Sequence, residues 1–175
     1  GNHWSMCQDS SRNRSHEVAL NFQIGPRELR TAQDWVDLAN LVNESVEGTA
    51  FNVIMMNDIE LSESQSVMIG KSNAFNGVFD GNGHTLTFNL SSTDVPYAAP
   101  FRYVGNANIR NLHVKGSITT SVRYASGLVG YMVYYTSPVI ENCISSINLK
   151  STVNGRATMG GLLGVDETRR SVILR

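Results

Sequence analysis

Two short segments recur in the second half of the chain, and their spacing constrains the fold more than any other feature. IRNL (109–112) is similar to IENC (140–143), 31 residues later, and GLVG (127–130) is similar to GLLG (161–164), 34 residues later. A degenerate copy, PFRYVG, occupies 100–105. Each unit contains an apolar strand, a Gly or Asn turn and a second apolar strand, and so short a unit must stack on its neighbours to bury its apolar face. The repeats therefore predict a solenoid of β coils.

Alternating apolar and polar residues predict short strands through most of the chain. The alternation begins at 18–24, stops at Gly25-Pro26, resumes over 51–61 and continues in short pieces from Val78 onward. Charged residues make up only 17 % of the sequence, and Gly, Ser, Thr and Asn are abundant, as is typical of turn-rich β proteins. We therefore expect an all-β domain.

One segment has helical periodicity instead. Thr31 and Asp34 match the capping-box pattern at a helix N-terminus. Behind them, the apolar residues that fall on one helical face before Glu47-Gly48 are Trp35, Leu38, Ala39, Val42 and Val46. These residues predict an α-helix at about 31–47. At this place a helix would close the first open end of the solenoid, covering apolar side chains and unpaired strand groups.

The length of 175 residues suits one domain with a substantial core. We interpret 1–16 as a flexible polar leader and 17–175 as a single β-helix domain, with an N-terminal strand and cap at 17–48 and coils from about 51 to 175. After Gly164 the residues suffice for one strand but not for a capping helix, and an open end invites strand pairing. We therefore expect self-association through the C-terminal coil, or shielding of that coil by a loop.

The pattern resembles a known family of repeats. FNGVFDGNGHTL (75–86), preceded by NDIEL (57–61) and followed by GLVG, IENC and GLLG, is similar to the GLUG-motif proteins. The resemblance covers roughly residues 31–165. It implies a bacterial, secreted or cell-surface protein with a short right-handed parallel β-helix, similar to the pectin-lyase-like superfamily. It also implies a repeat module rather than a catalytic domain.

The DGNGH segment (80–84) contains residue types that either bind calcium or turn a chain. An EF-hand-like loop needs oxygen ligands, a central glycine and a terminal glutamate. With Asp80 as position 1, the ligand positions 3 and 5 hold Asn82 and His84, the glycine position 6 holds Thr85, and the glutamate position 12 holds Ser91. The segment therefore does not match a calcium-binding loop. We interpret the segment as a turn in which Gly81 and Gly83 adopt positive φ while Asp80 and Asn82 bond nearby backbone N–H groups.

The repeat segments contain further turn residues. We predict that four glycines lie in turns: Gly127, Gly130, Gly161 and Gly164. We also predict that three asparagines lie in turns, with their amides stacked from coil to coil: Asn108, Asn111 and Asn142. The four histidines show no ligand spacing, so we expect no metal site, and no motif calls for a cofactor.

Charge and hydropathy narrow the function classes. Lys plus Arg total 14 against 15 for Asp plus Glu, so no net charge favours a nucleic-acid partner, and no apolar run is long enough to span a membrane. Between Gly81 and Val165 the acidic residues are Asp94 and Glu141, which is little material for the carboxylate pair of a glycosidase. We expect no catalytic residue, with a polysaccharide lyase or glycoside hydrolase of β-helix type as the alternative.

All six tyrosines lie within 97–135, at positions Tyr97, Tyr103, Tyr124, Tyr131, Tyr134 and Tyr135. Tyrosine offers a rigid flat ring with a polar tip, so a sheet face carrying several can stack on sugar rings or dock a protein. The other interpretation is that aromatic residues simply fill or coat the strands. Our main hypothesis is a non-catalytic, secreted or cell-surface module for adhesion to a glycan or protein ligand. The third hypothesis is a structural spacer within a larger surface protein.

Overall fold

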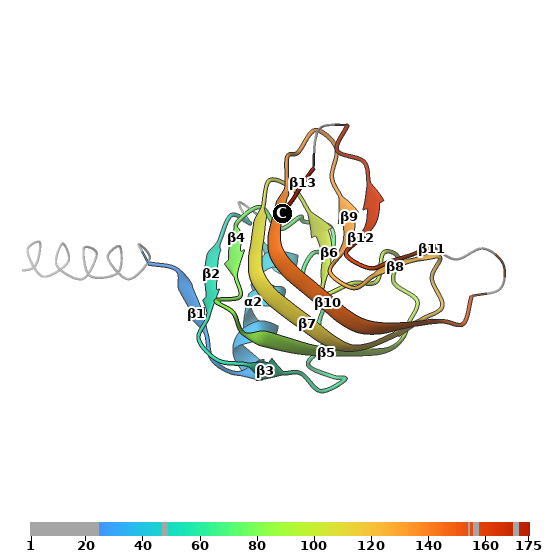
Figure 1. Ribbon diagram of the computed structural model, residues 1–175, viewed down its shortest axis with the longest axis horizontal. Helices are drawn as coiled ribbons and strands as arrows, with labels where there is room; N and C mark the ends of the chain where they lie inside the picture. The colour runs from blue at the N-terminus through green and yellow to red at the C-terminus, as the bar shows by residue number, and fades with distance from the viewer. Residues whose placement is uncertain (1–24, 47–48, 154, 156–157, 170–171) are drawn as a thin grey trace, which may run out of the picture.

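The computed structural model describes residues 25–46, 49–153, 155, 158–169 and 172–175. Over these residues the chain winds into a parallel β-solenoid of about four turns with one short helix near its N-terminal part (Figure 1). The predicted leader, 1–16, and the predicted strand at 18–24 lie outside the described residues.

Each coil contributes strands to the same stacked sheets. The first coil holds β2 (Asn52–Met55) and β3 (Ile59–Glu60), and the second holds β4 (Val78–Asp80), β5 (Thr85–Thr93) and β6 (Phe101–Val104). The third holds β7 (Asn108–Thr120), β8 (Tyr124–Ser126) and β9 (Val129–Met132), and the fourth holds β10 (Val139–Ser151), β11 (Thr158–Gly160) and β12 (Leu163–Asp166). The short strands β1 (Arg27–Leu29) and β13 (Ile173–Leu174) lie at the two ends of the large sheet.

The strands pair in parallel from coil to coil, and their register matches the sequence repeats. The large sheet runs β1-β2-β4-β7-β10-β13, with β3 and β5 joined to it, while β6, β9 and β12 form a second sheet and β8 and β11 a third. Ile109 pairs with Ile140, and Val129 pairs with Leu163, as the two offsets predict. The degenerate copy is shifted, however: Phe101 pairs with Val129, so Gly105 is not the counterpart of Gly130.

The helix α2 (Ala32–Glu44) closes the N-terminal end of the core. The Thr31 hydroxyl accepts the Asp34 N–H at 3.2 Å, and the Asp34 carboxylate accepts the Thr31 N–H at 3.1 Å, which completes the predicted capping box. Trp35 is fully buried, and its indole Nε1–H donates to the Val67 carbonyl at 2.9 Å. The indole meets three phenylalanine rings edge-on, at centroid distances of 5.8, 6.3 and 5.8 Å to Phe79, Phe88 and Phe101.

The end of the helix differs from the prediction. Val46 was expected on the apolar face, but α2 ends at Glu44 and the Val46 side chain is 95 % exposed. Asn43 explains the early end, because its amide donates to the Met68 carbonyl at 3.1 Å and accepts the Gly70 N–H at 2.8 Å. These two bonds fasten the last helical turn to the first coil, so the chain turns away there.

Two of the three predicted asparagines form a ladder across successive coils. The Asn142 amide donates to Asn111 Oδ1 at 2.9 Å, and the Asn111 amide donates to Asp80 Oδ1 at 3.2 Å. Both asparagines have positive φ, 50° and 53°, at the same corner of consecutive coils. Asn108 does not join the ladder, since its amide donates to Glu141 at 3.1 Å and its Oδ1 has no partner among the described residues. The ladder supplies hydrogen bonds where the corner interrupts the strands.

The DGNGH segment is a turn, although its glycines play different parts from those expected. Asn82 and Gly83 have positive φ, 53° and 78°, whereas Gly81 does not. Gly81 is instead pressed against the backbone of Asn111, where a Cβ would collide with the carbonyl. Asp80 Oδ1 accepts the Asn82 N–H at 2.8 Å, as predicted. The Asn82 amide instead donates to the Met55 carbonyl and accepts no N–H from the residues that the structure describes.

Candidate ligand-binding site

Four of the six tyrosines gather on one surface of the second and third coils. The β6–β9 register places Tyr103 beside Tyr131, with ring centroids 5.4 Å apart. Tyr97 lies 4.8 Å from Tyr131 and 6.0 Å from Tyr103, and it stacks on Tyr124 at 5.6 Å with an interplanar angle of 18°. All four side chains are half-buried. The stacking of coils therefore converts tyrosines that are distant in sequence into one aromatic cluster.

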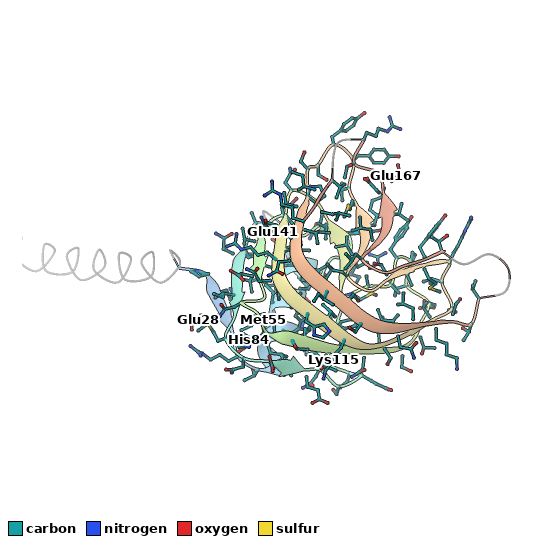
Figure 2. All side chains as sticks on the ribbon, in the orientation of Figure 1. Glu28, Met55, His84, Lys115, Glu141 and Glu167 are labelled. Atoms are coloured by element: carbon teal, nitrogen blue, oxygen red, sulfur yellow. The ribbon has the colours of Figure 1, made fainter. Side chains whose placement is uncertain are left out.

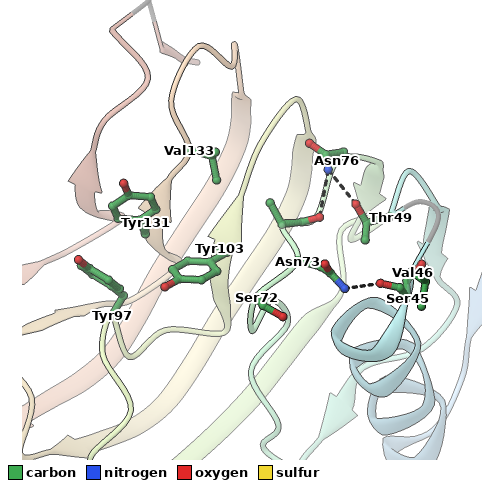
Figure 3. A pocket seen from close by; sticks show the side chains of 11 residues that line it. Ser45, Val46, Thr49, Ser72, Asn73, Asn76, Tyr97, Tyr103, Tyr131 and Val133 are labelled. Atoms are coloured by element: carbon green, nitrogen blue, oxygen red, sulfur yellow. Dashed lines mark hydrogen bonds between the residues drawn. The ribbon is translucent and has the colours of Figure 1, made fainter.

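A cavity of about 550 Å³ opens beside this cluster. Figure 3 shows Tyr97, Tyr103 and Tyr131 on one side of it and Ser72, Asn73, Asn76 and the end of α2 on the other. The remaining lining comes from Ser45, Val46, Thr49, Ala74 and Val133. The described residues that line the cavity include no charged side chain.

Some of the polar groups that line the cavity form hydrogen bonds within the protein, and others have no partner among the described residues. The Asn76 amide donates to the Thr49 hydroxyl at 2.7 Å, and Asn76 Oδ1 accepts the Asn106 N–H at 2.9 Å. The Asn73 amide donates to carbonyls at the end of α2. Asn73 Oδ1 and the hydroxyls of Tyr97 and Tyr131, by contrast, bond to none of the described residues, and all three side chains line the cavity.

Arg102 holds the tyrosine side of the cavity in place. Its side chain is buried, with Nε donating to the Pro96 carbonyl at 2.6 Å and Nη1 to the Lys71 carbonyl at 2.7 Å. The guanidinium lies 4.1 Å over the Tyr103 ring and donates to the Tyr103 hydroxyl at 3.2 Å. Because its donors go to backbone and phenol oxygens, Arg102 acts as a brace for two loops beside the cavity.

Tyr131 keeps its phenol proton. Burial raises the pKa of Tyr131 above its ordinary value of 10.0, and the negative charge of Glu167, labelled in Figure 2, raises it further. The hydroxyl therefore serves as a hydrogen-bond donor throughout the neutral range.

Tyr97 has an unusual backbone conformation. Its φ is 60°, in the left-handed region that bulky residues rarely adopt. Its carbonyl lies directly against Gly130, and a Cβ at Gly130 would collide with it. Gly130 and Gly164, predicted as turn residues, lie inside β9 and β12 and stack on one another, whereas Gly127 and Gly161 do lie in the bends between strands. Gly130 thus makes room for the strained loop that presents Tyr97.

The other two tyrosines form a separate pair. Tyr134 and Tyr135 are 44 % and 62 % exposed, with ring centroids 6.2 Å apart, and neither lines the cavity. The Arg169 guanidinium lies 5.1 Å over the Tyr134 ring. The six tyrosines proposed from sequence therefore do not make a single site.

Charged side chains line a second, smaller cavity of about 300 Å³, formed by Asp58, Ile59, Glu60, Thr85, Thr87 and Lys115. The outer face of the large sheet carries His84 and Lys115 (Figure 2), and His84 Nδ1 lies 3.2 Å from the Asp58 carboxylate. The Thr85 N–H, and after it His84, lowers the pKa of Asp58 on this exposed face. Within the described ranges no group of three or more His, Cys, Asp or Glu side chains is arranged to hold a metal ion. In the same part of the chain, no helix has the length and apolar character needed to cross a membrane.

Comparison with known proteins does not assign this site. The chain matches no protein-family model, and no curated protein or solved structure is significantly similar to it.

Proposed function

We propose that this chain is a non-catalytic β-solenoid module that binds a glycan in the tyrosine-lined cavity. The observation that carries the proposal is an aromatic wall in the same cavity as hydroxyl and amide oxygens that bond to none of the described residues. A sugar presents an apolar ring face and a rim of hydroxyl groups, which fits flat phenol rings with polar tips. A volume of about 550 Å³ lies within the range of small-molecule sites and accommodates one or two sugar rings.

The described residues of the lining are uncharged, which favours a neutral glycan and binding without cleavage. An acidic sugar buried there would lose hydration without gaining a cationic partner from the described lining residues. Hydrolysis by the usual route requires two carboxylates that flank the bond, and none lines the cavity among the described residues. These features support adhesion over the lyase or hydrolase alternative.

The biological setting belongs to the same proposal. The resemblance to the GLUG-motif proteins implies secretion or display at a cell surface, and the parallel β-solenoid supports this resemblance at the level of the fold alone. The aromatic cavity favours ligand binding over the spacer hypothesis, because a spacer requires no cavity.

A glycan array with neutral and uronate-containing members tests this proposal. Each hit is then incubated with the protein, and the glycan is analysed for new reducing or unsaturated ends. We expect binding to neutral glycans with the ligand recovered intact. Cleaved products would replace the proposal with the enzymatic alternative, and preferential binding of uronates would overturn the assignment of a neutral ligand. No binding to any member would favour the spacer.

A further inference from the structure

The fourth coil leaves one strand of the large sheet open. Strand β10 pairs with β7 along almost its whole length, from Val139 to Ser151. On its other side β13 covers only Val139 and Ile140, and the Asn142 N–H donates to the Arg175 carbonyl at 2.7 Å. Among the described residues, no strand pairs with the outer edge of β10 from Cys143 to Ser151. This edge presents backbone donors and acceptors to solvent, as an unpaired strand does.

The inward-facing side chains of β10 show the same opening. Leu112 and Ile118 of β7 are 2 % and 0 % exposed, whereas their partners in β10, Cys143 and Leu149, are only half-buried. Ile147 is also half-buried, as are Met159, Leu162 and Leu163 from the same coil. Positions that are fully buried one coil earlier are therefore only half-buried in this coil, which no other described coil covers.

The opposite end of the solenoid is closed. Helix α2 covers the first coil with Trp35, Leu38, Ala39 and Val42, all fully buried. One end therefore offers a long strand edge and an apolar cross-section. At the other end α2 covers the core, and the outermost strands β1 and β3 are only 3 and 2 residues long.

We propose that two copies of this chain associate through their C-terminal ends, with β10 of one copy antiparallel to β10 of the other. An open edge requires an extended strand as its partner, and a second copy supplies one of equal length. A two-fold axis normal to the sheet keeps inward faces on the same side, so the two half-exposed cores cover each other. The two-fold axis makes the contact isologous, and α2 covers the core at the other end, where the edge strands β1 and β3 are short, so association stops at a dimer instead of growing into a filament.

The side chains of β10 are compatible with this pairing. With the axis at Ile147, the two Ile147 side chains meet in the joined core. On the outer face Lys150 lies opposite Ile144, which is 62 % exposed in the single chain. No like charges lie opposite one another in this register, so electrostatic repulsion does not oppose it. The inference does not depend on the glycan proposal, although a dimer would present two cavities and raise avidity for a repeating ligand.

Sedimentation equilibrium over a wide concentration range tests the proposal. We expect a mass about twice 19.2 kDa. Ile147→Lys places a charge in the joined core while leaving its ammonium in water in the monomer, so we expect a Kd weakened by about a hundredfold or more. Asn148→Lys is the matched control, since it adds the same charge to the outer face of the same strand and leaves dimerisation within about threefold.

Hydrogen exchange locates the contact. In the dimer the amides of 143–151 gain protection that disappears on dilution and in Ile147→Lys, while circular dichroism shows that this variant stays folded. A monomer at every concentration would overturn the proposal. So would a dimer that survives Ile147→Lys, protection confined to another segment, or growth into filaments.

Discussion

Trp35 ties the capping helix to the solenoid, so its replacement tests whether the helix belongs to the core. Its indole is fully buried against Phe79, Phe88 and Phe101 and donates to the Val67 carbonyl at 2.9 Å. Truncating a buried Trp to Ala removes the ring and leaves a cavity, at about 3–5 kcal/mol. The orphaned carbonyl adds about 1 kcal/mol. We therefore expect Trp35→Ala to lower the free energy of unfolding by about 4–6 kcal/mol.

Urea unfolding followed by far-UV circular dichroism measures this loss from the midpoint and the slope. Trp35→Phe keeps most of the packing and loses the indole N–H bond, so it should lower the free energy of unfolding by about 1–2 kcal/mol. Val46→Ala is the matched control, because sequence periodicity puts Val46 on the same face while the structure leaves it 95 % exposed. It should change stability by less than about 0.5 kcal/mol. A loss below about 1 kcal/mol for Trp35→Ala, or a large loss for Val46→Ala, would refute this reasoning.

Three further changes follow from the same structure. Thr31→Ala removes the helix cap and should lower the free energy of unfolding in urea by about 1 kcal/mol; an unchanged stability would contradict the capping role. Burial tends to raise the pKa of Asp80, but bonds from the Asn82 N–H, the Asn111 amide and Arg110 outweigh it and hold the pKa below 3.8. The resulting stabilisation is present above pH 3.8 and lost as pH falls through the lowered pKa, so Asp80→Asn should be less stable than wild type at pH 7, and this difference should disappear in acid. Gly130→Ala should displace the Tyr97 loop and weaken ligand binding about tenfold while the far-UV spectrum is retained; unchanged affinity would contradict its positioning role.

The regular part of the fold was predictable because one physical constraint repeats in every coil. Inward positions must be apolar, so the offset between IRNL and IENC predicts the pairing of Ile109 with Ile140 that the structure shows. The capping box of α2 is equally local, since Thr31 and Asp34 are three residues apart. The helix end was mispredicted because Asn43 bonds to Met68 and Gly70, which are remote in sequence.

The candidate site was predictable only in part. The concentration of tyrosines was visible, but the separation of Tyr134 and Tyr135 from the others depends on a chain reversal in which Tyr135 adopts a φ of 57°. The polar side of the cavity, which includes Asn73 and Asn76, could not be predicted from the sequence. These two asparagines come from the first coil and resemble ordinary loop residues. Gly130 was singled out for the wrong reason, as a turn residue instead of the space that Tyr97 requires.

Calorimetric titration of the best neutral glycan into two tyrosine variants tests the central claim most directly. Tyr131→Ala removes a ring that contacts the cavity, and we expect its Kd to rise by about ten- to hundredfold, or about 1.4–2.8 kcal/mol. Tyr134→Ala removes the same chemical group from the separate pair and should leave the Kd within about twofold. Equal losses in the two variants, or a loss confined to Tyr134→Ala, would contradict the assignment of the ligand to the cavity.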